Sequence, residues 1–162
     1  MTMNPNNMSG LWQNMIKVID CIGICVSYIC HDGKGRIVLN KRGKNSRDEQ
    51  GRWDCGGGGL DFGTTVEETL RKEIKEEYGA DVISFEFLGY RDVFRELDGK
   101  KTHWLAIDFM VLVHSLQVMN AEPHKFDAVE WFAPDALPAP LHFGFSQMLE
   151  KYSKKINELG QK

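Results

Sequence analysis

The chain has 162 residues, enough for one domain with a sizeable hydrophobic core. Hydrophobic residues make up 42% of it and charged residues 27%, which is typical of a globular protein rather than a membrane-spanning one. The formal net charge of −3 provides no basic field, so we expect no nucleic-acid partner. A small phosphorylated substrate would need only a local positive patch.

The N-terminal segment carries no targeting or membrane signal. Residues 1–10 are rich in asparagine and lack both a basic stretch and an apolar centre, so we expect a disordered tail rather than a secretory signal. The apolar run 18–29 is interrupted by Asp20 and is too short to cross a bilayer. We therefore expect one domain over 11–162, with a short helix at 11–15 and no membrane partner.

Four cysteines lie in the sequence without a C-x-x-C pair: Cys21, Cys25, Cys30 and Cys55. The first three belong to an apolar stretch, where cysteine behaves as a small hydrophobic residue. We expect reduced core thiols rather than a disulfide or a zinc site, and this favours a cytoplasmic location.

The first regular elements are strands. Residues 16–30 are rich in β-branched and small apolar side chains, which predicts one or two strands. A turn at 31–35 and a second strand at 36–42 complete a hairpin. A polar, charged loop at 43–51 follows.

A helix is predicted after the glycine-rich turn at Gly56–Gly59. Thr65 and Glu68 have the spacing of a capping box, and Gly79 suits the position that ends a helix. Three apolar residues recur every four positions as a buried stripe: Val66, Leu70 and Ile74.

The second half of the chain alternates again. Residues 82–96 and 102–113 resemble strands joined by a hairpin turn at Asp98-Gly99. A short strand at 128–132 and an amphipathic helix at 145–159 follow. This order predicts an α/β fold with one mixed sheet between helices.

Three glutamates stand at i, i+3 and i+4 on the central helix: Glu73, Glu76 and Glu77. This spacing places them on one helical face, away from the apolar stripe and within about 6 Å of rise. Such like charges repel unless a cation lies among them, and oxygen ligands suit Mg²⁺ or Mn²⁺. The alternative is a solvated face neutralised by Lys72 and Lys75. The preceding glycines favour the metal, because they allow close backbone approach and a turn carbonyl can join the carboxylates.

The region resembles the Nudix hydrolases, whose signature runs G-x5-E-x7-R-E-U-x-E-E-x-G-U, with U aliphatic. The matching positions are Gly58, Glu73, Ile74, Glu76, Glu77 and Gly79, with Ala80 at the last U. Thr64 stands where the family has glutamate, and Lys72 where it has arginine. The stretch 53–58 is similar to the W-x-x-P-G-G segment of the family, with Gly56 in place of proline. The resemblance extends over about 16–152.

The resemblance implies a Nudix fold, an α/β/α sandwich around a mixed sheet. It also implies a hydrolase that depends on Mg²⁺, for which Mn²⁺ can substitute. The implied metal ligands are the Gly57 carbonyl and Glu73, Glu76 and Glu77. The implied catalytic residues are Glu73 or Glu76 as the base and Lys72 in the orienting role of the arginine.

Three basic residues flank the glycine turn where members of the family contact phosphates: Lys41, Arg42 and Arg52. Arg42 is the strongest candidate, because a guanidinium pairs with two oxygens; an ordinary exposed strand end is the alternative. Glu122 and Glu130 are candidates for one further metal ligand. Four aromatic residues are expected mostly in the core, with one or two free to stack on a base: Tyr90, Phe94, Trp104 and Phe109. The five histidines form no catalytic arrangement and are interpreted as structural or surface residues.

The segments 130–132 and 135–138 are similar to the W-F…L-P segment of MutT-like members. This favours hydrolysis of a nucleoside triphosphate, including an oxidised one, to monophosphate and pyrophosphate. Nucleotide sugars, ADP-ribose and dinucleoside polyphosphates remain open as substrates, and so does a catalytically weak nucleotide sensor, which Thr64 and Lys72 motivate. A P-loop is disfavoured, because the glycine run lacks a G-K-[ST] ending. The chain is expected to be a monomer or a homodimer.

Overall fold

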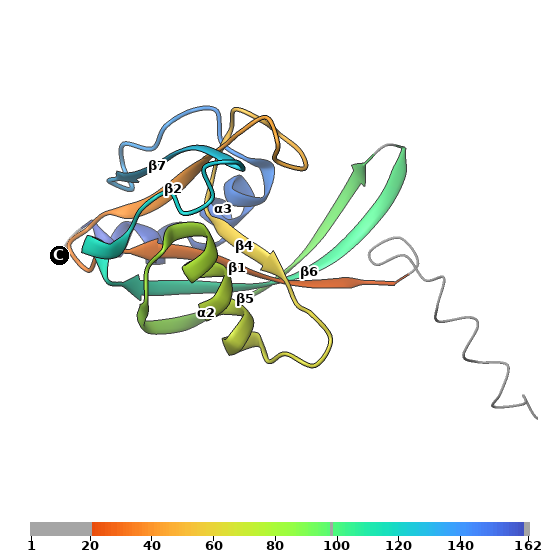
Figure 1. Ribbon diagram of the computed structural model, residues 1–162, viewed down its shortest axis with the longest axis horizontal. Coiled ribbons are helices and arrows are strands. Elements are labelled where there is room, and N and C mark those ends of the chain that lie inside the picture. Colours follow the sequence, from red (N-terminus) through yellow and green to blue (C-terminus); the bar gives the residue numbers. More distant parts are fainter. Residues whose placement is uncertain (1–20, 98, 161–162) are drawn as a thin grey trace, which may run out of the picture.

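A computed structural model describes residues 21–97 and 99–160 of the chain (Figure 1). The predicted tail, the helix at 11–15 and Asp98 of the hairpin turn lie outside the described residues. The strands are β1 Gly23–His31, β2 Ile37–Arg42, β3 Trp53–Asp54, β4 Gly56–Gly59, β5 Val82–Leu97, β6 Lys100–Val113 and β7 Phe126–Phe132. The helices are α2 Val66–Tyr78, α3 Phe143–Leu159 and the short 3-10 helix η2 Ser115–Gln117.

The described strands form one seven-stranded sheet with the main order β3-β2-β1-β6-β5, in which β4 also pairs with β1 and β7 with β2. β1 and β6 run parallel, from Gly23 opposite Trp104 to His31 opposite Leu112. The other pairings between these strands are antiparallel. The expected mixed sheet is therefore confirmed, with β1 at its centre.

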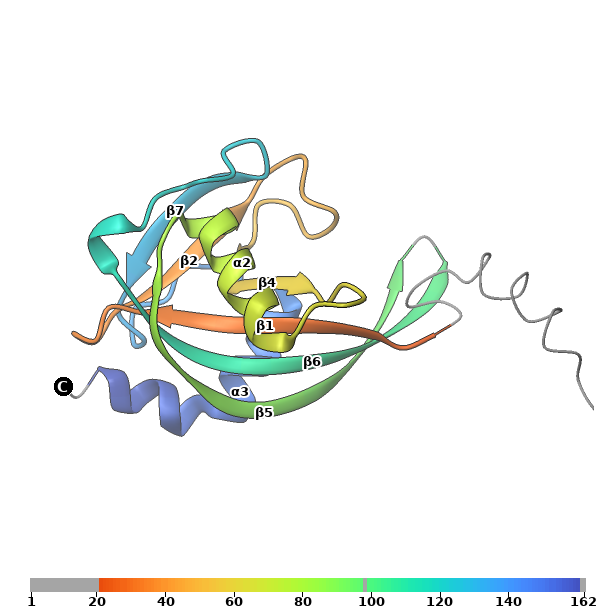
Figure 2. The same cartoon turned by 60° about the horizontal axis from the view of Figure 1, so that its bottom comes forward.

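The sheet separates two hydrophobic clusters, one under each long helix (Figure 2). On one face, α2 packs Leu70 and Ile74 against Val26 of β1 and Val111 of β6. On the other face, residues of α3 join a second cluster: Phe145, Met148 and Ile156. Each sheet face carries alternate side chains of the strands, so both faces are apolar and both need a helix. The predicted α/β/α sandwich is confirmed.

The predicted limits of α2 are also confirmed. Thr65 accepts from the Glu68 backbone N–H at 3.2 Å, and the Glu68 carboxylate accepts from the Thr65 N–H at 2.8 Å. This reciprocal pair satisfies two backbone donors that the first turn leaves unpaired. Gly79 ends the helix in the left-handed conformation, with φ of 68°.

β5 and β6 form a long hairpin whose outer part extends away from the rest of the fold (Figure 1). Because part of the hairpin lacks a covering helix, the expectation that most of its aromatics are core is wrong. Tyr90 and Phe94 are 59% and 66% exposed, Trp104 is half-buried, and Phe109 belongs to the core under α2.

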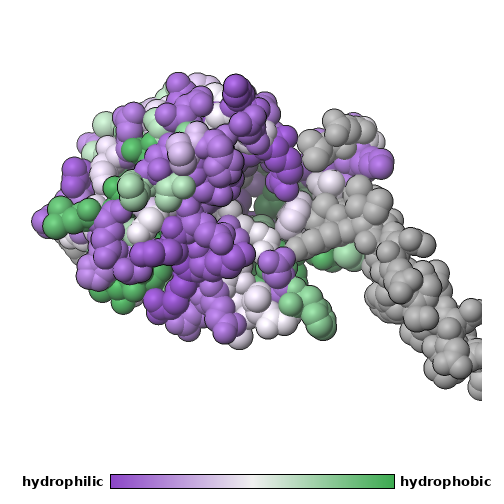
Figure 3. Space-filling view, viewed as in Figure 1, coloured by the Kyte–Doolittle hydropathy of each residue, from purple (hydrophilic) through white to green (hydrophobic). Residues whose placement is uncertain are grey.

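All four cysteines are free thiols, as predicted. Cys30 and Cys55 are buried, but Cys21 is exposed, which differs from the predicted core position. Hydrophilic side chains cover most of the face seen in Figure 3. No helix of the described region combines the length and the apolar character needed to cross a membrane.

Candidate active site

The glycine strand β4 lies between β1 and α2 and allows both to approach closely. A Cβ atom on Gly58 would lie 2.0 Å from Cδ of Glu73, and one on Gly56 would lie 1.8 Å from the ring of Tyr28. Glycine is therefore required at both positions for these side chains to keep their places. The contact at Gly56 also explains why the proline of the similar family segment is absent, because a proline ring would meet Tyr28.

Glu77 is buried at the junction of α2, β1 and β4, with an exposed fraction of 3%. Its Oε2 accepts from the Tyr28 hydroxyl at 2.8 Å and from the Gly57 backbone N–H at 3.3 Å, and its Oε1 accepts from Nζ of Lys125 at 2.9 Å. Burial raises the pKa of Glu77 to about 7, although Lys125 and Tyr28 act in the opposite direction. The carboxylate is thus held where its charge is only partly compensated.

The other two glutamates lie progressively closer to solvent. Glu73 is half-buried against Gly58, and burial followed by the charge of Glu76 raises its pKa. Glu76 is exposed, and its nearest cation is Nζ of Lys72 at 3.8 Å. The sequence predicted one carboxylate face distinct from the apolar stripe; in the structure this face runs from exposed Glu76 through half-buried Glu73 to Glu77, which is buried in the core.

The sequence did not predict a role for Lys125, which lies at the centre of the site. Its ammonium donates to Glu77 and, at 2.9 Å, to Oε2 of Glu122. The loop before β7 thus brings Glu122 beside the buried glutamate, whereas Glu130 points into solvent from β7. Lys125 lies 45 residues after Ala80, the last position of the signature, and therefore gives no sequence signal, because only the fold places it here.

In the regions 21–97 and 99–160 no three acidic, histidine or cysteine side chains gather as a ready metal cage. The donor chemistry nevertheless fits a hard divalent cation. The ammonium of Lys125 already stands between Glu77 and Glu122 as a cation would, and Glu73 fills the space above Gly58. Carboxylate oxygens with raised pKa values are ligands that such a cation would stabilise in their charged form.

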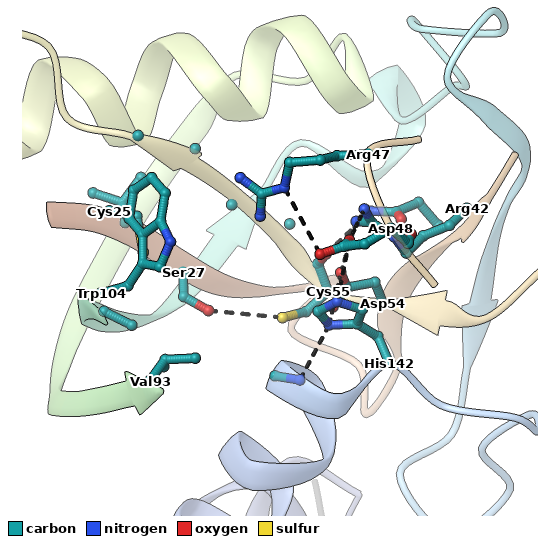
Figure 4. A pocket seen from close by; sticks show the side chains of 18 of the residues that line it. Cys25, Ser27, Arg42, Arg47, Asp48, Asp54, Cys55, Val93, Trp104 and His142 are labelled. Carbon is teal, nitrogen blue, oxygen red and sulfur yellow. Dashed lines mark hydrogen bonds and ion pairs between the residues drawn. The ribbon is translucent and has the colours of Figure 1, made fainter. Parts of the chain in front are cut away.

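A cavity of about 300 Å³ adjoins this cluster and is lined by β4, Glu77, Lys125 and the β5–β6 hairpin. Gly57 pairs with Ser27 of β1, and Gly59 pairs with Cys25, which in turn pairs with Ala106 of β6. The cavity therefore follows β4 from Glu77 toward the hairpin. Figure 4 shows the hairpin side, where Trp104 stands beside Cys25 and the side chain of Arg47 reaches toward it.

The three predicted phosphate-binding residues are placed differently from one another. Arg42 lines the cavity, but its guanidinium already donates to Asp48 at 2.6 Å and to Asp54 at 3.2 Å. Lys41 and Arg52 are not among the lining residues, and Arg52 is exposed and donates to the Leu141 carbonyl. Three further arginines line the cavity and were not predicted: Arg47, Arg91 and Arg95.

The loop between β2 and β3 forms part of the cavity wall and is held in place by ion pairs and hydrogen bonds. Arg95 of β5 donates to Asp48 at 2.7 Å and also to Glu49, and Glu49 accepts from the Phe143 N–H at the start of α3 at 2.9 Å. The nearby imidazole of His142 and the charges of nearby arginines lower the pKa of Asp48, so its carboxylate stays ionised. This loop joins β2, β5 and α3 around one opening.

His142 completes that wall, where the sequence reading had only a structural or surface histidine. Its Nδ1 lies 3.2 Å from Oδ2 of Asp54, and its Nε2 lies 3.8 Å from Oδ1 of Asp48. Burial alone would lower the pKa of His142, but its interactions with the carboxylates of Asp48 and Asp54 outweigh burial and raise the pKa to about 9. At neutral pH the imidazolium is therefore part of the charge network.

The chain is similar in sequence to known proteins. The chain is 28% identical to the CTP pyrophosphohydrolase of Escherichia coli over 144 residues, covering 86% of this chain and 93% of that protein. It is 25% identical to an RNA pyrophosphohydrolase of Gluconacetobacter diazotrophicus over 130 residues, covering 70% and 78%. These relatives share the family but are too distant to identify a substrate.

The fold has solved counterparts. The MutT NUDIX hydrolase from Burkholderia pseudomallei has a TM-score of 0.71 at 29% identity, covering 81% of this chain and 98% of that one. The MutT protein from Methanosarcina mazei has a TM-score of 0.68 at 25% identity, covering 83% and 94%. The sequence model of the NUDIX domain matches residues 23–152, from the start of β1 into α3. The chain therefore belongs to the Nudix family and is a Nudix pyrophosphohydrolase.

Proposed function

We propose that the enzyme hydrolyses a nucleoside triphosphate to the monophosphate and pyrophosphate, using Mg²⁺, for which Mn²⁺ can substitute. The observation that carries this proposal is the cavity that joins the carboxylates of α2 to an aromatic and arginine-lined end at the hairpin. A phosphate chain fits the first end and a nucleoside the second. Members of the Nudix family generally depend on a divalent metal, which agrees with the oxygen donors found here.

The residues proposed to hold the cation are the Gly57 carbonyl, Glu73, Glu76 and Glu77. When bound, a divalent cation neutralises phosphate oxygens and lowers the pKa of a water molecule. We propose Glu73 as either a third ligand or the base that accepts a proton; burial raises its pKa, which favours the second role. Lys72 is proposed to orient Glu76 across their 3.8 Å contact.

We propose that Lys125 and the arginines that line the cavity bind the substrate. Lys125 lines the cavity with an ammonium that can turn from Glu77 to a phosphate oxygen once a cation neutralises that carboxylate. Arg42 serves in this proposal through Asp48 and Asp54, by holding the loop that closes the cavity. Four free thiols support a reducing compartment, and we propose the cytoplasm.

A nucleotide panel with Mg²⁺ tests the proposal. Anion-exchange chromatography should show monophosphate and pyrophosphate from a nucleoside triphosphate, and no turnover after chelation. Nucleotide sugars, ADP-ribose and dinucleoside polyphosphates belong in the same panel. Binding of every nucleotide without turnover would contradict hydrolysis and support a sensor.

A second substrate is a 5′-triphosphorylated RNA, because two of the relatives are named RNA pyrophosphohydrolases, at 25% and 31% identity. The net charge of −3 argues against a long RNA contact. A short triphosphorylated RNA and a free nucleoside triphosphate should be compared by kcat/KM at two salt concentrations. A strong salt dependence with RNA preference would reverse our choice of substrate.

A further inference from the structure

The hairpin end of the cavity is lined by one half-buried aromatic side chain, Trp104. In the described part of the chain, the aromatic residues lining the cavity are Trp104 and Phe126. Phe126 is 2% exposed and lies under Nζ of Lys125, which is 4.7 Å from its ring centre. Trp104 is half-buried, and its neighbours Val93 and Ala106 extend the same apolar wall.

A flat cationic group already faces the indole. The guanidinium carbon of Arg47 lies 5.7 Å from the ring centre of Trp104 (Figure 4). This distance exceeds the roughly 3.5 to 4 Å of direct stacking contact between flat groups. The guanidinium therefore lies over the ring without direct stacking contact.

The side chain of Arg47 can move away from the Trp104 ring to admit a ligand. Its side chain is 59% exposed, and its ion pair with Asp48 is long, at 3.7 Å. Asp48 is bound more closely by Arg42 at 2.6 Å and by Arg95 at 2.7 Å, so the loop stays fastened when Arg47 moves. A third flat group between the two needs about 7 Å, two stacking distances, which asks for a shift of only an ångström or two.

We propose that Trp104 and Arg47 clamp the base of the substrate between indole and guanidinium. The inference rests on the proposed function, and it assigns the residues that distinguish a nucleotide from a plain polyphosphate. Stacking requires only a flat face, so both purine and pyrimidine nucleotides should bind. The arginine adds attraction to ring nitrogens and carbonyls of the base while Trp104 supplies the apolar surface.

The first test compares nucleotide with inorganic tripolyphosphate, which has no base. Trp104→Leu should raise KM for a nucleoside triphosphate by roughly 5- to 150-fold, the range for losing one base–aromatic stack. The inhibition constant of tripolyphosphate should stay unchanged. Trp104→Phe keeps a ring and should restore most of the affinity, and Arg47→Lys should bind better than Arg47→Ala.

Phe94→Leu is the matched control, because Phe94 is an exposed aromatic on the same hairpin that stacks on His103 outside the cavity. It should leave KM unchanged. Equal losses for nucleotide and tripolyphosphate in Trp104→Leu, or no loss for either, would overturn the clamp. A 5′-triphosphorylated RNA tested beside the nucleotide shows whether the clamped base is free or the first base of a chain.

The second test does not depend on turnover. Titration with a nucleoside monophosphate should quench tryptophan fluorescence in the wild-type enzyme, and the quenching should be lost in Trp104→Phe. If no nucleotide is hydrolysed while this quenching persists, the proposed reaction fails and the base clamp stands. If hydrolysis proceeds without quenching at Trp104, the clamp fails and the reaction stands.

Discussion

At the scale of single residues, the site depends on carboxylates that the fold treats unequally. Glu77 is buried beside Lys125, Glu73 is half-buried against Gly58, and Glu76 is exposed near Lys72. Three glutamates within two helical turns therefore have three different electrostatic environments. Metal binding should matter most where burial penalises the charge most, at Glu77.

Glu77→Gln should lower kcat/KM by at least about a hundredfold, in the range for a disturbed metal site. Mg²⁺ should raise the Tm of the wild-type enzyme, because it binds the folded state, and should scarcely raise that of the variant. Thermal unfolding with and without Mg²⁺, together with steady-state kinetics, measures both effects. Glu67→Gln removes an exposed carboxylate from the same helix and serves as the control. An unchanged rate in Glu77→Gln would exclude the metal assignment.

Lys72 tests the departure from the family arginine. Its contact with Glu76 is long and exposed, so a guanidinium with several donors should hold that carboxylate more firmly. Lys72→Arg should preserve or raise kcat, and Lys72→Ala should lower it because the glutamate loses its orientation. Lys75→Ala removes a neighbouring charge that pairs with Asp81 and controls for net charge. Equal kcat in all four proteins would make Lys72 an ordinary solvated residue.

At the scale of elements, β4 is a strand whose glycines have separate purposes. The atom that a Cβ on Gly56 would meet belongs to the buried ring of Tyr28, which cannot move without disturbing the core. The atoms that a Cβ on Gly58 would meet belong to the carboxylate end of Glu73, a flexible side chain. The first contact concerns packing, and the second concerns the site.

Two alanine substitutions in β4 should therefore separate stability from activity. Gly56→Ala should lower the free energy of unfolding by about 1 to 3 kcal/mol through overpacking. Gly58→Ala should keep most of that stability but lower kcat by about tenfold or more, because Glu73 is displaced. Urea unfolding and steady-state kinetics on both variants provide the comparison. The reverse pattern would show that Gly58 supports packing rather than the carboxylate.

At the scale of the whole molecule, His142 connects the start of α3 with the loop between β2 and β3. Charged His142 donates from Nδ1 to Asp54, whereas neutral His142 can accept there from the Gly144 N–H at 3.1 Å. Its Nε2 also lies near Arg95, Glu49 and Asp48. Because its folded pKa of about 9 exceeds the usual 6.5, this stabilisation is complete below pH 6.5 and is lost as pH rises through 9.

Between pH 7.5 and 9.5 the free energy of unfolding should therefore fall by about 2 kcal/mol through His142. His142→Asn should flatten this fall, because asparagine can cap α3 but does not titrate. Chemical unfolding at several pH values within this window measures the slope. The pKa of Glu77 is raised from 4.5 to about 7, so its effect is to lower the free energy of unfolding as pH rises from 4.5 through 7, mainly below this window. Equal slopes in the two proteins would assign the pH dependence to other groups.

The local elements were predictable because their signals are local. A capping box, an apolar stripe at every fourth residue and a closing glycine define α2 from the sequence, and the structure confirms each of them. The spacing of Gly58, Glu73, Glu76 and Glu77 likewise identified the family, because it combines a glycine for close backbone approach with carboxylates 15 to 19 residues later. Such patterns lie within one short stretch of the chain.

Tertiary structure alone decided which charged residues share the cavity. Lys125 reaches Glu77 across 48 positions of sequence, and Arg95 reaches Asp48 across 47, by pairings that the sheet creates. It also decided burial, so that Glu77 became a core residue while the aromatics Tyr90 and Phe94 became exposed on an uncovered hairpin. The sequence by itself determined the helix and the reaction family, whereas the predicted glycine turn is wrong over Gly56–Gly59, which form strand β4 paired with β1. The pairing of distant strands determined the electrostatic environment, because charge interactions depend on distance in space and on exclusion of water rather than on separation along the chain.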